Sequence, residues 1–254
     1  MALYNNFPID SLNNFIVNKD RVDSRDLICK AVNNNLSNIV DLRKWCSPIE
    51  DQLHLGSCVA QAIVGAFELM INKSYPGKFK DLSRLFLYYN ARLLDGYTEE
   101  DVGVYVRDGI KAVNKWGICA EDLWPYLIKK FADIPMAESY IDAKTRLIDT
   151  YKRIETVDDM ISTINTGFPI VSGIQVFNGF DELRRDGKLG MPSRKDELLG
   201  GHAICIVGYD NIKKYFICRN SFGEDWGDKG YFYMPHDYAE YYCMDAWMFD
   251  IKLL

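Results

Sequence analysis

Residues 56–73 read GSCVAQAIVGAFELMINK, and this stretch carries the clearest helical pattern in the chain. Apolar side chains recur along it at steps of three and four: Val59, Ile63, Phe67 and Met70. Ser57 is a suitable N-cap residue, so Cys58 is predicted to lie in the first turn of the helix. Because a helix N-terminus stabilises negative charge, a thiolate at Cys58 would be favoured there. Taken alone, a buried and unreactive cysteine is the commoner outcome.

A nucleophilic cysteine needs a base, and the chain has three histidines, at positions 54, 202 and 236. His202 lies in LGGHAICIVGYD, where two glycines leave space beside the ring and a predicted strand holds it. His54 is close to Cys58 in sequence and is interpreted as a loop residue that could contact substrate. His236 is interpreted as structural or exposed. His202 is therefore the candidate base.

A third group must orient the base, and Asn220 in CRNSFGEDWGDKGY is the candidate. An amide oxygen that accepts the imidazole N–H fixes the ring and supports the imidazolium. The common use of asparagine in turns is the alternative. The order Cys, His, Asn favours the catalytic interpretation, with separations of 202 − 58 = 144 and 220 − 58 = 162 residues.

Three segments, EDQLHLGSCVAQA, LGGHAICIVGYD and RNSFGEDWGDKGY, resemble the signature blocks of papain-like cysteine peptidases, the papain and cathepsin family. The resemblance covers roughly residues 41–249. It implies an α+β fold of two lobes, a helical N-terminal lobe packed against a β-sheet or barrel lobe, with the active-site cleft between them. It also implies hydrolysis of peptide bonds in peptide or protein substrates, without a metal or cofactor.

The resemblance assigns roles to single residues. Cys58 matches the nucleophile, His202 the base and Asn220 the orienting amide. Gln52 matches the glutamine that forms the oxyanion hole together with the Cys58 backbone N–H, a type of donor whose loss costs roughly 10²–10³ in rate.

Three further positions match the walls of the family's cleft. Trp226 matches an aromatic residue on the primed side, and Phe222 stands where the family has a tryptophan over the His–Asn hydrogen bond. Gly103 matches a glycine whose backbone pairs with the substrate. The main specificity pocket of the family closes near Asp245 and Ala246.

Two departures from the family pattern lie beside the nucleophile. Leu55 replaces a cysteine that the family holds in a disulfide, which fits a reducing compartment. Val59 replaces an aromatic residue, so a slimmer cleft wall is expected. Neither change removes a reacting group, but both leave the substrate preference open.

Residues 1–37 are polar and weakly periodic, and we expect an N-terminal extension before a domain at 38–254. The extension is either a short inhibitory prosegment or a flexible addition with little core of its own. Within the domain, residues 38–150 are expected to form the helical lobe and 151–254 the β lobe. Helices are predicted at these positions: 83–96, 104–116, 137–149 and 158–165. Strands are predicted over FPIVSGIQVF, HAICIVGYD, KKYFICRNS and GYFYMP.

The composition excludes several classes of partner. With 48% hydrophobic and 26% charged residues the chain is globular, and its net charge of −6 argues against nucleic acid. No apolar run is long enough for a membrane span, and no signal peptide is visible. We therefore expect the cytoplasm or another reducing compartment, with most of the seven cysteines as free thiols. Oligomeric state is not readable from the sequence.

Two other functions remain open at this point. The chain could be a catalytically inactive papain-like binding module, although all four site residues are present. It could also be an acyl transferase or amidase on the same scaffold, which would prefer an added amine to water as acceptor.

Overall fold

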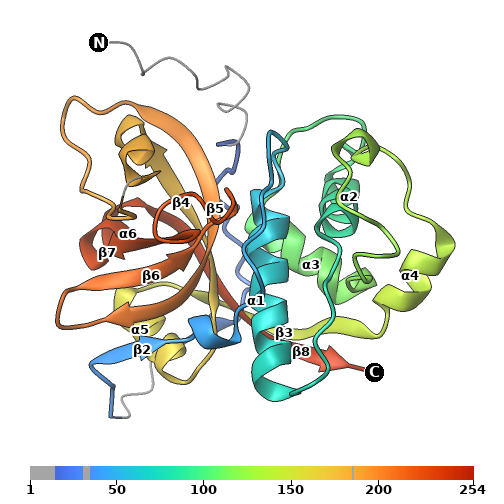
Figure 1. Ribbon diagram of the computed structural model, residues 1–254, viewed down its shortest axis with the longest axis horizontal. Helices are drawn as coiled ribbons and strands as arrows, with labels where there is room; N and C mark the ends of the chain where they lie inside the picture. The colour runs from blue at the N-terminus through green and yellow to red at the C-terminus, as the bar shows by residue number, and fades with distance from the viewer. Residues whose placement is uncertain (1–14, 31–34, 185) are drawn as a thin grey trace.

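The computed structural model describes residues 15–30, 35–184 and 186–254, which form two lobes side by side (Figure 1). One lobe contains the helices α1 to α4, and the other contains most of the sheet with α5 and α6 on it, while β3 and β8 extend beneath the helical lobe. The helices are α1 (Cys58–Ser74), α2 (Arg84–Asp95), α3 (Val106–Trp116), α4 (Ala137–Ala143), α5 (Val157–Asn165) and α6 (His236–Tyr242). This arrangement confirms the predicted α+β fold of two lobes.

Helix α1 is the central element of the molecule. Every residue from Cys58 to Ile71 is buried, because α1 packs on α2 and α3 on one side and on the sheet on the other. Its neighbour α2 begins and ends where the sequence predicts. The Ser83 hydroxyl accepts a hydrogen bond from the Phe86 N–H, and Gly96 at φ 81° closes the helix.

The described residues contain an eight-stranded sheet that remains open. Its strands are β1 (Ile28–Cys29), β2 (Ile39–Asp41), β3 (Arg146–Ile154), β4 (Ile170–Phe177), β5 (Leu198–Asp210), β6 (Tyr215–Arg219), β7 (Tyr231–Pro235) and β8 (Cys243–Leu253). The order is β1-β3-β8-β4-β5-β6-β7, and β2 pairs with β5. The long strand β5, the predicted mount of His202, therefore lies inside the sheet between β4 and β6.

One predicted helix is wrong in its length. The helix expected over residues 137–149 ends at Ala143, and the chain enters β3 at Arg146. Arg146 pairs with Leu253, more than a hundred residues away on β8. Such a long-range pairing overrides local helix propensity, and a local pattern does not reveal it.

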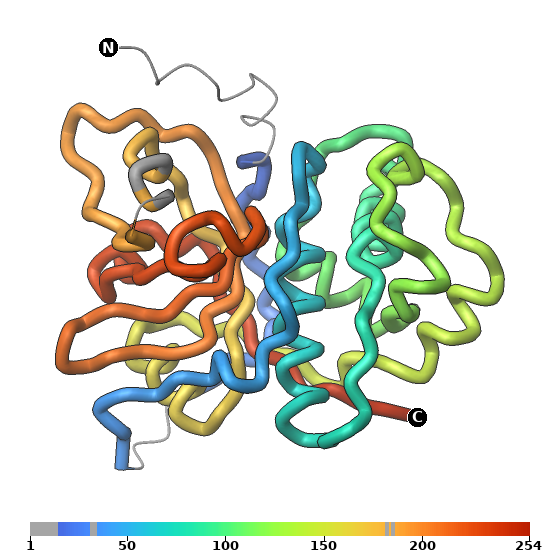
Figure 2. The backbone as a smooth tube through the Cα atoms, viewed as in Figure 1, coloured from blue at the N-terminus to red at the C-terminus, as the bar shows by residue number. Residues whose placement is uncertain are grey.

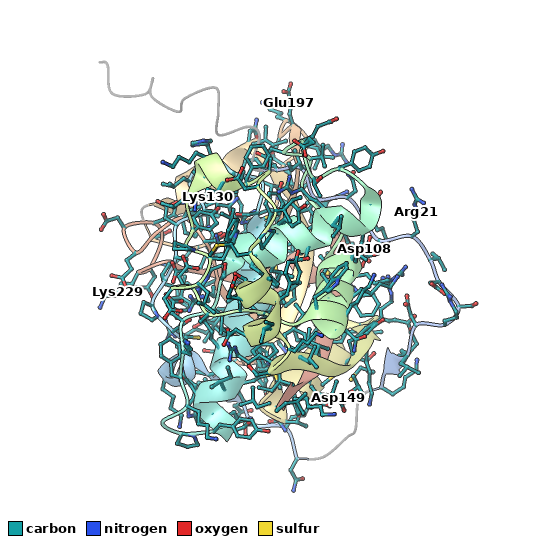
Figure 3. The ribbon with its side chains drawn as sticks, turned by 90° about the vertical axis from the view of Figure 1, so that its right-hand side faces the viewer. Arg21, Asp108, Lys130, Asp149, Glu197 and Lys229 are labelled. Carbon is teal, nitrogen blue, oxygen red and sulfur yellow. The ribbon has the colours of Figure 1, made fainter. Side chains whose placement is uncertain are left out.

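The N-terminal segment 15–26, which we call the strap, lies between the two lobes. It appears in dark blue in Figure 2, beside α1, and leads into the short strand β1, which pairs with β3. Val17 and Asp20 are buried, whereas Arg21, labelled in Figure 3, is exposed. The expected extension, residues 1–37, thus contributes to the core through its described part, while residues 1–14 and 31–34 lie outside the described residues.

Two further observations concern the whole described part of the chain. None of its helices has the length and apolar character needed to cross a membrane. All seven cysteines are unpaired, in line with the expectation of free thiols.

Candidate active site

Cys58 is the first residue of α1, as the sequence predicts, and is completely buried. Its thiol lies against the backbone N–H groups of Ala203, Val59 and its own residue. Because Ala203 follows His202 on β5, the N-terminus of α1 meets the sheet at the predicted base. Ser57 stands at the N-cap position, but its side chain makes no capping bond to the helix.

Catalysis needs an ionised Cys58, but the surroundings of its thiol oppose ionisation. Burial raises its pKa to about 12, and the nearby backbone N–H groups offset only part of this effect. The negative charge of Asp101 raises the pKa slightly further. Burial therefore favours the protonated form of the thiol.

His202 is held in a fixed orientation on β5. Its Nε2 atom forms a hydrogen bond of 2.8 Å with Oδ1 of Asn220, and both residues are buried. The Phe222 ring stacks on the imidazole with a centroid distance of 4.9 Å, and Trp226 meets Phe222 edge-on at 5.6 Å. The structure thus brings four predicted site residues together, with an aromatic cover over the His–Asn hydrogen bond.

Gln52 is buried directly before the nucleophile loop. Its side-chain amide donates to the Leu55 carbonyl at 3.0 Å, and its Oε1 accepts from the Ser221 hydroxyl at 2.6 Å. The Gln52 N–H also donates to the Ser221 carbonyl at 2.9 Å. Ser221 therefore links the predicted oxyanion residue to the neighbouring Asn220. Sequence reasoning missed Ser221, although its position next to Asn220 was a usable signal.

Tyr126 is a second residue that the sequence did not reveal. Its hydroxyl forms a hydrogen bond of 2.6 Å with the Ser57 hydroxyl and donates to the Gln52 carbonyl at 3.0 Å. It thereby fixes both ends of the loop that leads to Cys58. No local pattern indicated this role, because Tyr126 lies 69 residues from Ser57.

The opposite wall of the cleft is tied together without a disulfide. Asp101 accepts a hydrogen bond from the Gly56 N–H at 3.0 Å and another from the Tyr88 hydroxyl. The same hydroxyl accepts from the Gly103 N–H at 3.2 Å. These contacts fix Gly103, which has a φ of 66°, next to the nucleophile loop in which Leu55 replaces a cysteine.

The strap fills the groove between these walls. Ile16 pairs with Gly201 as in a parallel ladder, with Gly201 N–H donating to Phe15 O at 3.1 Å and Val17 N–H donating to Gly201 O at 3.0 Å. A Cβ atom on Gly103 would stand 2.8 Å from the Ile16 side chain. The Phe15 ring meets His202 edge-on at 5.7 Å. The predicted cleft is thus occupied by the chain itself.

The remaining histidines lie apart from this site in their packing. His54 is exposed in the loop before Cys58. His236 is buried against Phe216, with ring centroids 4.5 Å apart, and burial lowers its pKa. Among the described residues no group of three or more His, Cys, Asp or Glu side chains could hold a metal ion.

A cysteine at a helix N-terminus, an imidazole on the facing strand and an amide behind that imidazole define the class of two-lobed cysteine hydrolases. The family model described as papain family cysteine protease matches residues 36–248. The chain therefore belongs to the papain family of cysteine proteases.

Individual relatives agree with this assignment. An uncharacterized peptidase C1-like protein of Acanthamoeba polyphaga mimivirus is 40% identical over 227 residues, covering 84% of this chain and 73% of that protein. Peptidase 1 of Psoroptes ovis is 28% identical over 223 residues, covering 85% of this chain. The match covers 66% of that protein's length, slightly less than two thirds.

Among solved structures, xylellain, a cysteine protease from Xylella fastidiosa, superposes with a TM-score of 0.86 at 30% identity. The match covers 95% of this chain and 96% of xylellain.

Proposed function

We propose that this protein hydrolyses peptide bonds with Cys58 as nucleophile, His202 as base and Asn220 as the residue that orients the base. The observation that carries the proposal is the hydrogen bond from His202 to Asn220, on the strand whose next residue, Ala203, contacts the Cys58 thiol. A base that is held by an amide beside a sulfur nucleophile fits acyl transfer.

In the proposed reaction, the Cys58 proton moves to His202 and the sulfur attacks the peptide carbonyl carbon. Negative charge develops on the carbonyl oxygen, where the Cys58 N–H and the Gln52 side-chain amide stabilise it. His202 then gives its proton to the leaving amine as the C–N bond breaks. Water, deprotonated by His202, attacks the thioester, releases the carboxylic acid and regenerates the thiol.

We further propose that the strap inhibits the enzyme. By the family resemblance, substrate residues before the scissile bond lie along Gly103, and those after it along Trp226. The strap runs the opposite way, from Phe15 beside His202 and Phe222 to Ile16 beside Gly103. This reversed direction would keep the strap from being cleaved while it blocks access to Cys58.

The peptidase proposal is tested with a peptide library, comparing the wild-type chain with Cys58→Ala after mild treatment that displaces the strap. Cleavage by the wild type and none by Cys58→Ala supports the proposal. No cleavage, together with tight peptide binding, would support an inactive binding module instead. Preferential formation of amides when an amine is added would indicate an acyl transferase.

A further inference from the structure

The loop that leads to Cys58 is held by a carboxylate from the opposite wall of the cleft. The Gly56 N–H, two residues before the nucleophile, donates to both carboxylate oxygens of Asp101, at 3.0 Å to Oδ1 and 3.2 Å to Oδ2. Asp101 belongs to the segment between α2 and α3 and lies 45 residues from Gly56 along the chain. The backbone turns tightly after Gly56, because the Ser57 N–H donates to the Leu55 carbonyl at 2.7 Å. A shift of Gly56 would therefore be passed directly to Cys58.

Asp101 is itself held by Tyr88, which is fully buried on α2. The Tyr88 hydroxyl donates to Oδ1 of Asp101 and accepts from the Gly103 N–H at 3.2 Å. One hydroxyl thus fixes the chain on both sides of Val102. Oδ1 of Asp101 accepts from both the Gly56 N–H and the Tyr88 hydroxyl. This single oxygen therefore joins the nucleophile loop to α2.

A buried guanidinium holds the residues that precede Asp101. Arg92 is fully buried on α2, one turn after Tyr88, and its Cζ lies 4.2 Å from the centroid of the Tyr88 ring. Its Nη1 donates to the carbonyls of Thr98 at 2.7 Å and Glu100 at 2.9 Å. Moving this loop would leave buried donors without acceptors, which is costly. The position of Asp101 is therefore set by α2.

The charge of Asp101 does not by itself favour catalysis. Burial raises the pKa of the Cys58 thiol to about 12, and the negative charge of Asp101 acts in the same direction. A carboxylate that served only through its charge would therefore hinder ionisation of the nucleophile. The hydrogen bond to the Gly56 N–H is the favourable contribution that remains. Cys58 supplies both the sulfur and an oxyanion N–H in the proposed reaction, and the placement of both depends on this loop.

We propose that Asp101 is a positioning residue for the peptidase reaction, which holds Cys58 opposite His202 through the Gly56 N–H. The inference rests on the proposed peptidase function and adds a residue to it. The tether consists of hydrogen bonds to a carboxylate, so it needs no oxidised cysteine at the position of Leu55. The alternatives are a purely structural role for Asp101 and a role in binding the substrate.

The test uses the full chain with Val17→Asp as the parent, because a charge at this buried strap position should release the strap. The Val17 side chain lies on the Gly173 side of the strap, whereas Ile16 is the strap residue that contacts Gly56. In this parent, Asp101→Ala removes the tether. Asp101→Asn keeps an oxygen in the place of Oδ1, which can accept both hydrogen bonds. Steady-state kinetics on one quenched fluorescent peptide gives kcat and KM for each variant.

Asp101→Ala should lower kcat about tenfold to a hundredfold, the usual loss for a hydrogen bond to a charged group, with a much smaller change in KM. Asp101→Asn should keep kcat within about twofold of the parent, because the hydrogen bonds remain. Glu99→Ala removes an exposed carboxylate two residues earlier and is the matched control, which should leave kcat and KM unchanged. Tyr88→Phe removes the hydroxyl behind Asp101 and should lower kcat about fivefold, so it serves as the test where Asp101→Ala does not fold.

Equal kcat for the parent and Asp101→Ala would overturn the inference, and so would a loss as large in Asp101→Asn as in Asp101→Ala. A change confined to KM would also overturn it, because it would assign Asp101 to substrate binding. If the parent cleaves no peptide, the peptidase proposal itself has failed, and amide hydrogen exchange at Gly56 then tests the tether. In the parent with Cys58→Ala, faster exchange with Asp101→Ala than with Asp101→Asn supports the tether, and equal exchange contradicts it.

Discussion

Ile16 pairs with Gly201 in a parallel register, one residue before the candidate base His202. A Cβ atom on Gly201 would stand 2.0 Å from the Val17 carbonyl oxygen, so only glycine allows the strap backbone this close. The backbone edge that the strap uses is the edge on which a substrate chain would add by strand pairing. The strap and a substrate therefore compete for one groove.

The first prediction concerns this competition. Ile16→Asp places a charge in the apolar contact with Gly56 and Gly103 and should release the strap. We expect peptidase activity to rise at least about tenfold, since burying an unpaired charge costs more than ~1.4 kcal/mol. Val22→Asp is the matched control, because Val22 is 98% exposed on the same segment. Equal activity of the two variants would contradict inhibition by the strap.

A second prediction concerns the reactivity of Cys58. Burial raises its thiol pKa to about 12 and so favours the protonated thiol. We expect iodoacetamide to alkylate Cys58 slowly at pH 7 in the wild type and much faster in Ile16→Asp. Mass spectrometry of peptides gives both rates, and the half-buried Cys46 serves as an internal reference. Fast labelling of Cys58 in the wild type would show that the cleft is open.

The third prediction is a pH dependence of strap docking. The pKa of Asp20 is about 6 when docked and 3.8 in the ordinary group, so docking takes up a proton between these values. The contribution to docking is complete below about pH 4 and is lost as the pH rises through 6. Burial also raises the pKa of Asp245, which likewise weakens docking as the pH rises. The other charged groups around Asp20 and Asp245 are Asp26, Arg107 and Arg153.

Strap release should therefore increase by up to roughly a hundredfold between pH 4 and pH 7. A fluorophore on the N-terminus of Cys58→Ala reports release without interference from catalysis. Asp20→Asn should flatten the profile, because it removes the titrating carboxyl. Stronger docking at pH 7 than at pH 4 would reverse the sign and refute the assignment.

The sequence predicted the parts of the site that follow from local pattern. Cys58 at the start of a helix and His202 on a strand could be read from periodicity and flanking glycines, and the helix from Ser83 to Gly96 from its caps. Ser221 and Tyr126 could not, because their roles depend on contacts with Gln52 and Ser57 across long sequence separations.

The effect of burial on the ionisation of Cys58 also could not be predicted from the sequence. Helix position alone favours an ionised Cys58, but complete burial of the side chain opposes ionisation and raises the pKa of the thiol. Likewise, a polar segment rich in Asn and Asp gave no indication that Asp20 would find buried partners such as Trp247. In both cases the outcome depends on how tertiary packing removes the side chain from water, which local sequence patterns do not encode.

The fourth prediction concerns the oxyanion hole in the strap-released background. Gln52→Ala in Ile16→Asp should lower kcat by about 10²–10³ with a smaller change in KM, since the amide acts mainly on the transition state. Ser221→Ala leaves the Gln52 amide in place but frees its Oε1, so a smaller loss is expected, about tenfold. Steady-state kinetics on one peptide separates the two. A change in KM alone for Gln52→Ala would exclude the oxyanion role.

The fifth prediction concerns the stability of the helical lobe that carries Cys58. Glu68 on α1 and Arg84 on α2 form an ion pair of 2.8 Å, with exposed side-chain fractions of 0% and 2%. Glu68 also accepts from the Ser47 hydroxyl and the Leu82 N–H, so its carboxylate holds three segments together. Without Glu68, the buried Arg84 keeps only the partly exposed carboxylates of Asp81 at 2.6 Å and Glu50 at 3.3 Å. The expected cost is therefore at the lower end of the range for a broken buried pair, about 3 kcal/mol.

Glu68→Ala should therefore lower the free energy of unfolding in urea by about that amount. Asp108→Ala, which removes the partially exposed pair with Lys111 at 3.7 Å, should change it by less than about 1 kcal/mol. The double variant Glu68→Leu/Arg84→Met should recover much of the loss, because apolar side chains of similar size leave no buried charge. If Glu68→Ala alone is as stable as the wild type, the pair does not hold α1 against α2, and the position of Cys58 depends on the apolar contacts of α1.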